Sequence, residues 1–96
     1  MYFLIVSYSK PPEIAEQYFK EHCAWLHKYI DEGIFLASGP KKSKLGGAIL
    51  VRSIDKQQLN KILEENIYFK EDVVEYLIVD MDCKLAATGF EKLLGS

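Results

Sequence analysis

One histidine stands out among the residues of this chain that could do chemistry. His22 lies one helical turn after Tyr18 and one turn before Trp25, on the apolar stripe of a predicted amphipathic helix. An imidazole that faces a sheet from such a stripe can take up or release a proton near neutral pH. We therefore predict that His22 is a general acid or base, the alternative being a core histidine bound to a backbone carbonyl. His27 lies on the polar face and is predicted to be a surface residue.

Four of the five side chains predicted to bind substrate are singled out by their residue type and place beside this imidazole. Ser38 stands at the end of a predicted strand, where its hydroxyl could bind a ligand, although a turn serine is the commoner interpretation. Tyr8 and Tyr68 offer phenols that could polarise a substrate oxygen, although 6 tyrosines in one domain favour core edges and interfaces. Trp25 is predicted either to anchor the core or to form a wall of the pocket.

Other chemistry finds little support in the sequence. The acidic residues near the last predicted strand have no paired His or Cys at ligand spacing, so no metal site is predicted. Gly46-Gly47 begins a strand and faces no helix N-terminus, so no phosphate loop and no cofactor are expected. Cys23 points about 100° around the helix from the histidine and is expected to be inert. Lys41, Lys42 and Lys44 form either a solvated loop or a rim that attracts a small anionic ligand.

Length and composition restrict the possible function classes. The 96 residues have room for one domain, and 49% hydrophobic with 27% charged residues is usual for a globular protein. The net charge of −2, from 12 basic and 14 acidic side chains, provides no field for gripping nucleic acid or an anionic membrane. No apolar run approaches the roughly 20 residues that span a bilayer. Because no export signal is recognised, the two cysteines favour reduced thiols and a cytoplasmic location.

The hydrophobic periodicity predicts the elements that position these residues. The predicted ranges are a strand at 2–8, a helix at 13–31, strands at 34–38 and 48–52, a helix capped by Ser53 or Asp55, a strand from 73 to about 81, and a tail at 83–96 that could form a short docking helix. Right-handed crossovers turn this order into a ferredoxin-like α+β fold, βαββαβ, with a four-stranded antiparallel sheet and two helices on one face. We expect a single domain over residues 1–96, with its core in 1–82 and a C-terminal tail.

The first and last predicted strands are apolar on both faces, although the two helices can cover only one side of the sheet. Tyr8, Tyr76 and their neighbours are therefore expected to need a second cover, for which the tail is barely large enough. A second copy of the chain, packed sheet against sheet, is the simplest one. We predict a homodimer.

A longer run of residues carries a family resemblance. The segment from His22 to Pro40 combines a helical histidine with a Gly-hydrophobic stretch that ends in Gly39-Pro40, and Gly46-Gly47 then begins a strand. After the second helix, Asn66-Ile67-Tyr68 stands where the family has Asp-Pro-Phe. In this order the motifs resemble the YCII-related (YciI-like) family over residues 1 to about 81, most of the chain.

The resemblance implies a dimeric α/β-barrel protein, in which two ferredoxin-like chains pair, with a site built around a His–Asp pair. His22 takes the place of the family's histidine, whereas Asn66 replaces the aspartate and Ile67 the proline. An amide cannot act as the anionic partner that raises the basicity of an imidazole, but its oxygen can still orient the ring. Related members include a dehydrochlorinase of a chlorinated hydroxyquinol, and more distant barrel relatives isomerise lactones.

The sequence leaves two functions open. The first is a small-molecule enzyme with cofactor-independent lyase or isomerase chemistry, in which His22 moves a proton in a pocket between the first helix and the sheet. Asn66 would then orient His22 or bind substrate. The alternative is a non-catalytic dimer that binds a small anionic or aromatic ligand or acts as an accessory domain, which the replacement of the family Asp favours. A nucleic-acid module of the same topology would need a basic, aromatic strand signature that this sequence lacks.

Overall fold

The chain forms one sheet with helices packed along it. The computed structural model describes residues 1–95. The elements in chain order are β1 (Tyr2–Tyr8), α1 (Pro12–Glu16), α2 (Phe19–Asp31), β2 (Phe35–Pro40), β3 (Gly46–Val51), α3 (Lys56–Glu64), α4 (Ile67–Lys70), β4 (Val74–Asp80) and a 3₁₀ turn at Glu91–Leu93. None of the helices within residues 1–95 is long and apolar enough to cross a membrane.

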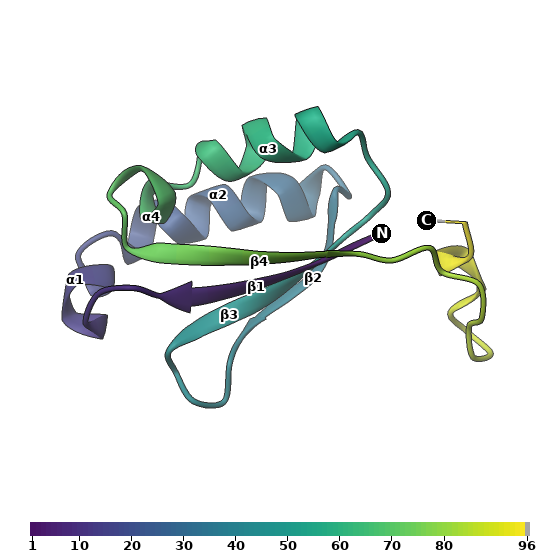
Figure 1. Cartoon of the computed structure of the whole chain (residues 1–96), viewed down its shortest axis with the longest axis horizontal. Coiled ribbons are helices and arrows are strands. Elements are labelled where there is room, and N and C mark those ends of the chain that lie inside the picture. The colour runs from purple at the N-terminus through teal and green to yellow at the C-terminus, as the bar shows by residue number, and fades with distance from the viewer. Residues whose placement is uncertain (96) are drawn as a thin grey trace.

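The strands pair in the order β2-β3-β1-β4, and every neighbouring pair is antiparallel. β1 lies inside the sheet, with Leu4 opposite Ile49 of β3 on one side and Ile78 of β4 on the other. α2 and α3 run along the same face of the sheet, and α1 and α4 lie near one end of it (Figure 1). This is the ferredoxin-like arrangement that the order of elements predicts, and the predicted fold class is confirmed.

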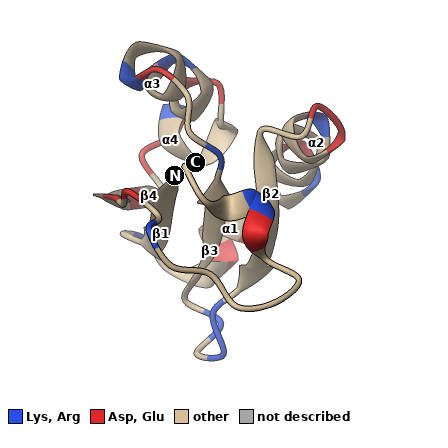
Figure 2. Cartoon of the chain, turned by 90° about the vertical axis from the view of Figure 1, so that its right-hand side faces the viewer, with Lys and Arg blue, Asp and Glu red and all other residues tan. Residues whose placement is uncertain are grey.

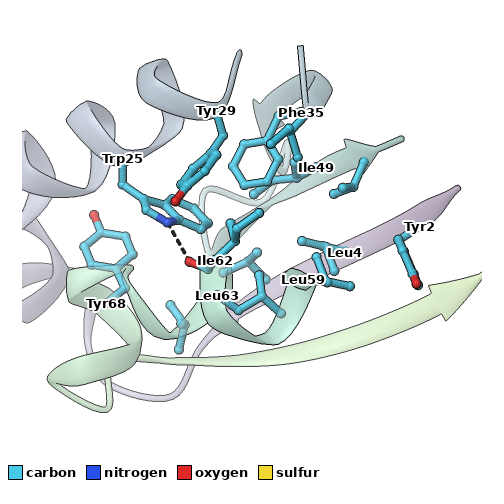
Figure 3. Packing of buried hydrophobic residues seen from close by; sticks show 14 of the residues in the cluster. Tyr2, Leu4, Trp25, Tyr29, Phe35, Ile49, Leu59, Ile62, Leu63 and Tyr68 are labelled. Atoms are coloured by element: carbon cyan, nitrogen blue, oxygen red, sulfur yellow. Dashed lines mark hydrogen bonds between the residues drawn. The ribbon is translucent and has the colours of Figure 1, made fainter. Parts of the chain in front are cut away.

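The hydrophobic core fills the space between the two long helices and the sheet. Strand residues alternate between the two faces, so Leu4 and Val6 of β1 lie on the helix side and are buried. Burying a side chain of this size contributes about 1.5–3 kcal/mol. Figure 3 shows the core from close by; its labelled residues are Tyr2, Leu4, Trp25, Tyr29, Phe35, Ile49, Leu59, Ile62, Leu63 and Tyr68.

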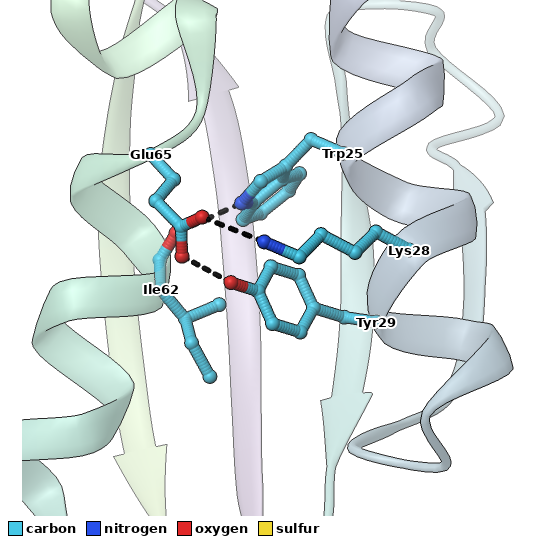
Figure 4. Close-up of polar contacts among 5 residues, drawn as sticks. All are labelled: Trp25, Lys28, Tyr29, Ile62 and Glu65. Carbon is cyan, nitrogen blue, oxygen red and sulfur yellow. Dashed lines mark hydrogen bonds and ion pairs between the residues drawn. The ribbon is translucent and has the colours of Figure 1, made fainter.

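Polar contacts tie α2 to the C-terminal end of α3. The Lys28 ammonium lies 3.1 Å from a carboxylate oxygen of Glu65, and the Tyr29 hydroxyl donates a hydrogen bond to the other oxygen. The indole N–H of Trp25 donates to the backbone carbonyl of Ile62 at 2.8 Å (Figure 4). The indole and phenol sit in the core while their polar atoms reach partners, which is how buried Trp and Tyr are accommodated. The helix that carries His22 is thereby held to α3 at more than one turn.

Two elements differ from the sequence-based expectation. The continuous helix predicted over residues 13–31 is wrong at Gln17 and Tyr18, where α1 stops and α2 begins. α1 and α2 point in different directions, so the chain has to turn between them (Figure 1). The other difference is α4, a single helical turn that was not predicted. Asn66 caps it by accepting a hydrogen bond from the backbone N–H of Tyr68 at 3.2 Å.

The face of the sheet away from the helices is apolar and uncovered. Phe3, Leu77 and Val79 are 38%, 61% and 47% exposed, and the register places all three on that face. The expectation that Tyr8 and Tyr76 need a second cover is wrong, because both rings pack against the helix-side core. Figure 2 shows charged residues on the helices and in the β2–β3 hairpin, with long stretches of the strands uncharged.

The predicted tail does not cover this open face. Residues 83–95 include one 3₁₀ turn rather than a docked helix, and Figure 1 shows the tail extending beyond the end of β4. Leu85, a large apolar residue of the tail, is 92% exposed. The open face therefore has no cover within the described residues.

Candidate functional site

A cavity lies between α2 and the end of the sheet where β2 turns into β3. Its volume of about 480 Å³ is in the range of sites for small molecules. The residues that line it are Val6, Tyr8, Phe19, His22, Cys23, Leu26, His27, Ile30, Ser38, Gly39, Pro40, Gly46, Gly47, Ala48, Ile49 and Tyr68. The position is the one that the sequence predicts for a pocket, between the first long helix and the sheet.

Glycines keep the sheet side of this cavity open. Gly39, Gly46 and Gly47 all line it and present no side chain to α2. Gly46 also has a φ of +133°, and a Cβ atom there would lie 1.9 Å from the carbonyl oxygen of Val6. Only glycine fits this close approach of β3 to β1. Gly46 is therefore required by the backbone, and the Gly-Gly pair also leaves space for a ligand.

His22 lies on the cavity wall with one side of its imidazole held. Its Nδ1 is 2.9 Å from Oδ1 of Asn66, and its ring stacks on Tyr68 with centroids 4.0 Å apart and planes 7° from parallel. The side chain is half-buried. Nε2 has no hydrogen-bond partner anywhere in residues 1–95. The ring is thus fixed in place, and its second nitrogen remains available to a ligand.

The backbone of α4 decides which ring nitrogen of His22 carries the hydrogen. Asn66 is fully buried at 0% exposure, and its Oδ1 accepts the Tyr68 backbone N–H at 3.2 Å. Because a backbone N–H can only donate, the atom beside it must be the amide oxygen and not the NH₂ group. The same oxygen faces Nδ1 of His22, so Nδ1 carries the hydrogen and donates to it. In the neutral imidazole, Nε2 is then the unprotonated nitrogen with a free lone pair.

The electrostatics of the site favour this neutral form. Burial lowers the pKa of His22 below its ordinary value, and the hydrogen bond with Asn66 offsets this only in part. Among the described residues, no Lys, Arg, Asp or Glu side chain lines the cavity. The suggested basic rim is not formed by Lys41, because its ammonium donates to Oγ of Ser7 at 2.7 Å and neither residue lines the cavity. The imidazole is therefore an uncharged base at neutral pH.

Three of the predicted substrate-binding residues share the cavity wall with His22. Tyr8 and Tyr68 contact each other edge to face with centroids 6.0 Å apart, and both line the cavity. Burial raises the pKa of Tyr68, and the neighbouring Tyr8 raises it further, so the phenol stays protonated. Ser38 lines the opposite wall from β2 and is exposed. The structure thus brings two phenols, a hydroxyl and an imidazole to one cavity.

The other two predicted residues lie behind the wall. Trp25 is 6% exposed and does not line the cavity, and its ring packs on Phe35 and Tyr29 in the core. Its proposed role as a substrate-contacting residue is therefore replaced by the alternative of a core anchor. Asn66 also does not reach the cavity. Of the two roles proposed for it, the structure fits orientation of His22 and not contact with substrate.

Part of the cavity wall that α2 provides was not predicted from the sequence. Cys23, expected to be inert, and His27, expected to lie on the surface, both line the cavity together with Phe19. Their four-residue spacing is a second helical stripe, turned relative to the core stripe that includes Trp25 and Tyr29. The polar His27 interrupts the second stripe, which hid it from a search for apolar periodicity. Within residues 1–95, no group of three or more His, Cys, Asp or Glu side chains is placed to hold a metal ion.

Comparison with known proteins places the chain in a family. The model of the YCII-related domain matches residues 1–82. The chain belongs to this family. The match agrees with the resemblance drawn from His22, Gly39-Pro40 and Gly46-Gly47, and it ends where the tail begins.

A solved structure supports the same fold. It is the 5-chloro-2-hydroxyhydroquinone dehydrochlorinase from Burkholderia phenoliruptrix in complex with 2,5-dihydroxybenzoquinone, with a TM-score of 0.68 at 15% sequence identity. The likeness covers 84% of this chain and 93% of that one. At this identity it shows the shared fold. No curated protein matches the sequence.

Proposed function

We propose that this YCII-related protein is a small-molecule enzyme in which His22 acts as a general base in cofactor-independent proton transfer. The observation that carries the proposal is the polarity of the His22–Asn66 hydrogen bond. Nδ1 is occupied as a donor to Asn66, so the lone pair of Nε2 is left at the wall of a cavity of about 480 Å³. A base that is neutral at physiological pH and held by packing meets the requirements for this chemistry.

The cavity suits a small cyclic or aromatic molecule that carries oxygen. Its wall is mostly apolar and includes the rings of Tyr8, Tyr68 and Phe19, against which a planar ligand can pack. The hydroxyls of Tyr8 and Ser38 can donate hydrogen bonds to a ligand oxygen. No lysine or arginine within residues 1–95 lines the cavity, so a strongly anionic ligand would lack a cationic partner. We therefore favour the aromatic over the anionic ligand of the sequence-based hypothesis.

The proposed reaction needs no redox partner. Nε2 of His22 removes a proton from a substrate carbon beside a carbonyl, and the electron pair of the broken C–H bond moves onto the carbonyl oxygen to give an enolate. Tyr8 donates a hydrogen bond to that oxygen as its charge develops. The imidazolium then returns the proton to another atom of the substrate, which is an isomerisation. Alternatively, the electron pair returns from the oxygen and expels a leaving group such as halide from the neighbouring carbon, and the imidazolium gives its proton to water, which is an elimination.

The dehydrochlorinase of similar fold supports a ring-shaped ligand, because it is in complex with a dihydroxybenzoquinone. Elimination of HCl and isomerisation both begin with the same proton transfer. The family and the shared fold thus support an enzyme of this kind, while the residues of this chain supply the base.

Deuterium exchange tests the proposal because it detects the first proton transfer, whatever product follows from it. Chlorinated hydroquinones, cyclic 1,3-diketones and butenolides would be incubated with the protein in D₂O, and loss of their acidic C–H signals followed by NMR. We expect enzyme-dependent exchange or conversion for at least one class, abolished in His22→Gln. Lys20→Gln, an exposed change on the same helix, should retain the wild-type rate. Binding of 2,5-dihydroxybenzoquinone with no exchange or conversion of any probe would favour the non-catalytic alternative.

We also propose that the protein works as a homodimer that pairs through the open face of the sheet. Phe3, Leu77 and Val79 form an apolar surface there that neither the helices nor residues 83–95 cover. Exposed apolar area of this kind marks interfaces in soluble proteins. A second copy of the chain has the same surface, so pairing by two-fold symmetry covers the apolar surface of both copies.

A further inference from the structure

Tyr76 lies behind the site, out of reach of any ligand in the cavity. Its ring comes from β4 and is half-buried. Its Oη is 2.8 Å from Nδ2 of Asn66 and 3.3 Å from the backbone carbonyl oxygen of Leu63. Asn66 is thus held at both ends of its amide, since Oδ1 already accepts the Tyr68 backbone N–H. Nothing in the family match assigns a role to this tyrosine.

The contacts of Tyr76 have a direction. A carbonyl oxygen can only accept, so the hydroxyl proton of Tyr76 points to Leu63 and its lone pair is left for the amide of Asn66. Burial raises the pKa of Tyr76 to about 12, so the phenol keeps its proton at all physiological pH values. The amide N–H of Asn66 therefore donates to Tyr76, and the amide oxygen is turned toward His22.

We propose that Tyr76 is a positioning residue, which acts through Asn66 to keep the hydrogen of His22 on Nδ1 and the lone pair on Nε2. The inference deepens the proposed function and depends on it for its catalytic meaning. The chain of donors runs from His22 to Asn66, from Asn66 to Tyr76, and from Tyr76 to Leu63. Each of these hydrogen bonds has one possible direction, because the last acceptor in the series is a backbone carbonyl, which cannot donate.

Reversal of the amide would change the chemistry of the site. The NH₂ group of Asn66 would then face Nδ1 of His22 and the backbone N–H of Tyr68. Nδ1 would have to become an acceptor, and the hydrogen of the neutral ring would move to Nε2. The cavity would face an N–H donor where the wild-type protein presents a base. Tyr76 and the Tyr68 backbone are the two groups that oppose this reversal, so loss of one weakens the preference without removing it.

The tautomer of His22 can be read directly by NMR of uniformly ¹⁵N-labelled protein above the pKa of the imidazole. In the wild-type protein we expect the ring pattern of a single Nδ1–H tautomer. In Tyr76→Phe we expect that preference to weaken by about three- to tenfold, the usual net worth of one hydrogen bond, so that the Nε2–H form becomes detectable. Tyr2→Phe is the matched control, because it also removes a tyrosine hydrogen bond to a backbone carbonyl, at Ile54. It should leave the tautomer unchanged.

A second measurement does not depend on whether the variant folds. In the wild-type protein, the side-chain amide protons of Asn66 should exchange slowly with solvent and show a nuclear Overhauser effect to the Tyr76 ring. Fast exchange, or an effect to the His22 ring in its place, would overturn the inference. So would a folded Tyr76→Phe with a wild-type tautomer.

Activity separates this inference from the proposed function. With a substrate from the exchange experiment, Tyr76→Phe should lower kcat in proportion to the fraction of His22 that NMR finds in the Nε2–H form, and should leave KM nearly unchanged, since Tyr76 does not touch the ligand. An unchanged kcat would contradict the role of Tyr76 and leave His22 as the base. An Nε2–H tautomer in the wild-type protein would contradict both proposals, whereas an Nδ1–H tautomer without any activity would contradict only the proposed function.

Discussion

The two faces of the sheet are built from the same strands and differ in every other respect. On the helix side, Leu4 and Val6 are buried, and the amide of Asn66 has a partner for each of its polar atoms. On the open side, Phe3 of β1 and Leu77 of β4 point away from these core residues and remain exposed. One face is thus complete within a single chain, and the other is apolar without a cover.

With the proposed homodimer, this difference separates what each chain provides alone from what the pairing of two chains provides. The cavity, His22 and the groups that hold its ring all lie on the helix side of one chain. The open side carries the exposed apolar side chains of Phe3, Leu77 and Val79. Changes on the helix side should therefore alter chemistry and folding, whereas changes on the open side should alter association.

The largest effect is expected from removal of the base. His22→Gln keeps an N–H that can donate to Asn66 but has no group that takes up a proton at neutral pH. The rate of substrate exchange or turnover should fall by about 10²–10⁴-fold, the usual contribution of a positioned general base. Far-ultraviolet circular dichroism should show a folded protein. A folded variant with wild-type turnover would place the chemistry elsewhere on this face.

Asn66→Ala should cause the largest loss of stability. The change removes the cap of α4 and leaves the buried Nδ1–H of His22 and the hydroxyl of Tyr76 with one partner fewer. We expect the free energy of unfolding to fall by about 2–4 kcal/mol in urea denaturation. A loss below about 0.5 kcal/mol, the usual effect of a surface change, would show that the network is not formed in solution.

The order of the elements could be predicted from the sequence because it depends on local patterns. A short run of apolar residues marks β1, helical spacing marks α2 and α3, and Gly33 stands two residues after the end of α2. The apolar stripe also led to His22, since one imidazole among large apolar side chains is a local signal.

The connections behind His22 could not be predicted in the same way. Tyr76 lies 10 residues from Asn66 and on another element, and nothing in the sequence aims its hydroxyl at that amide. The turn at Tyr18 and the short α4 depend on how neighbouring elements pack, which periodicity does not report. The wall formed by Cys23 and His27 was missed because a cavity-lining stripe need not be apolar.

The open face provides the next comparison. Leu77→Lys places a charge on the most exposed apolar residue of that face. If two copies pair there, the dimer should weaken by about 1–3 kcal/mol, about five- to a hundredfold in Kd. Sedimentation at micromolar concentration should then shift toward a species of 11.0 kDa. Gln57→Lys adds the same charge on exposed α3 and should leave the dimer intact. A wild-type protein that sediments as an 11.0 kDa species would contradict the homodimer.

Asn66→Asp sharpens the account of the helix-side face. A carboxylate beside Nδ1 favours the imidazolium, so the pKa of His22 should rise relative to wild type by about one unit or more. Tyr76 would have to turn its hydroxyl from Leu63 to the new carboxylate, which offsets part of the gain. NMR titration of the His22 ring protons measures the change, with His27 as an internal control. Equal titration midpoints in both proteins would show that position 66 is not coupled to His22.

The smallest effect is expected in the pH dependence of stability. Burial lowers the pKa of His22 in the folded chain, so the unfolded chain takes up the proton first as the pH falls through about 6.5. The free energy of unfolding should therefore decrease from that point down to the folded-state pKa, by at most about 1.4 kcal/mol per pH unit. The ring contacts Asn66 and Tyr68 remain uncharged in this range, so the slope reports the imidazole itself. His22→Gln should lack this component, and urea denaturation at several pH values would show the difference. A steeper slope in the variant, or stability that increases as the pH falls through this window, would mean that the imidazole gains and does not lose basicity on folding.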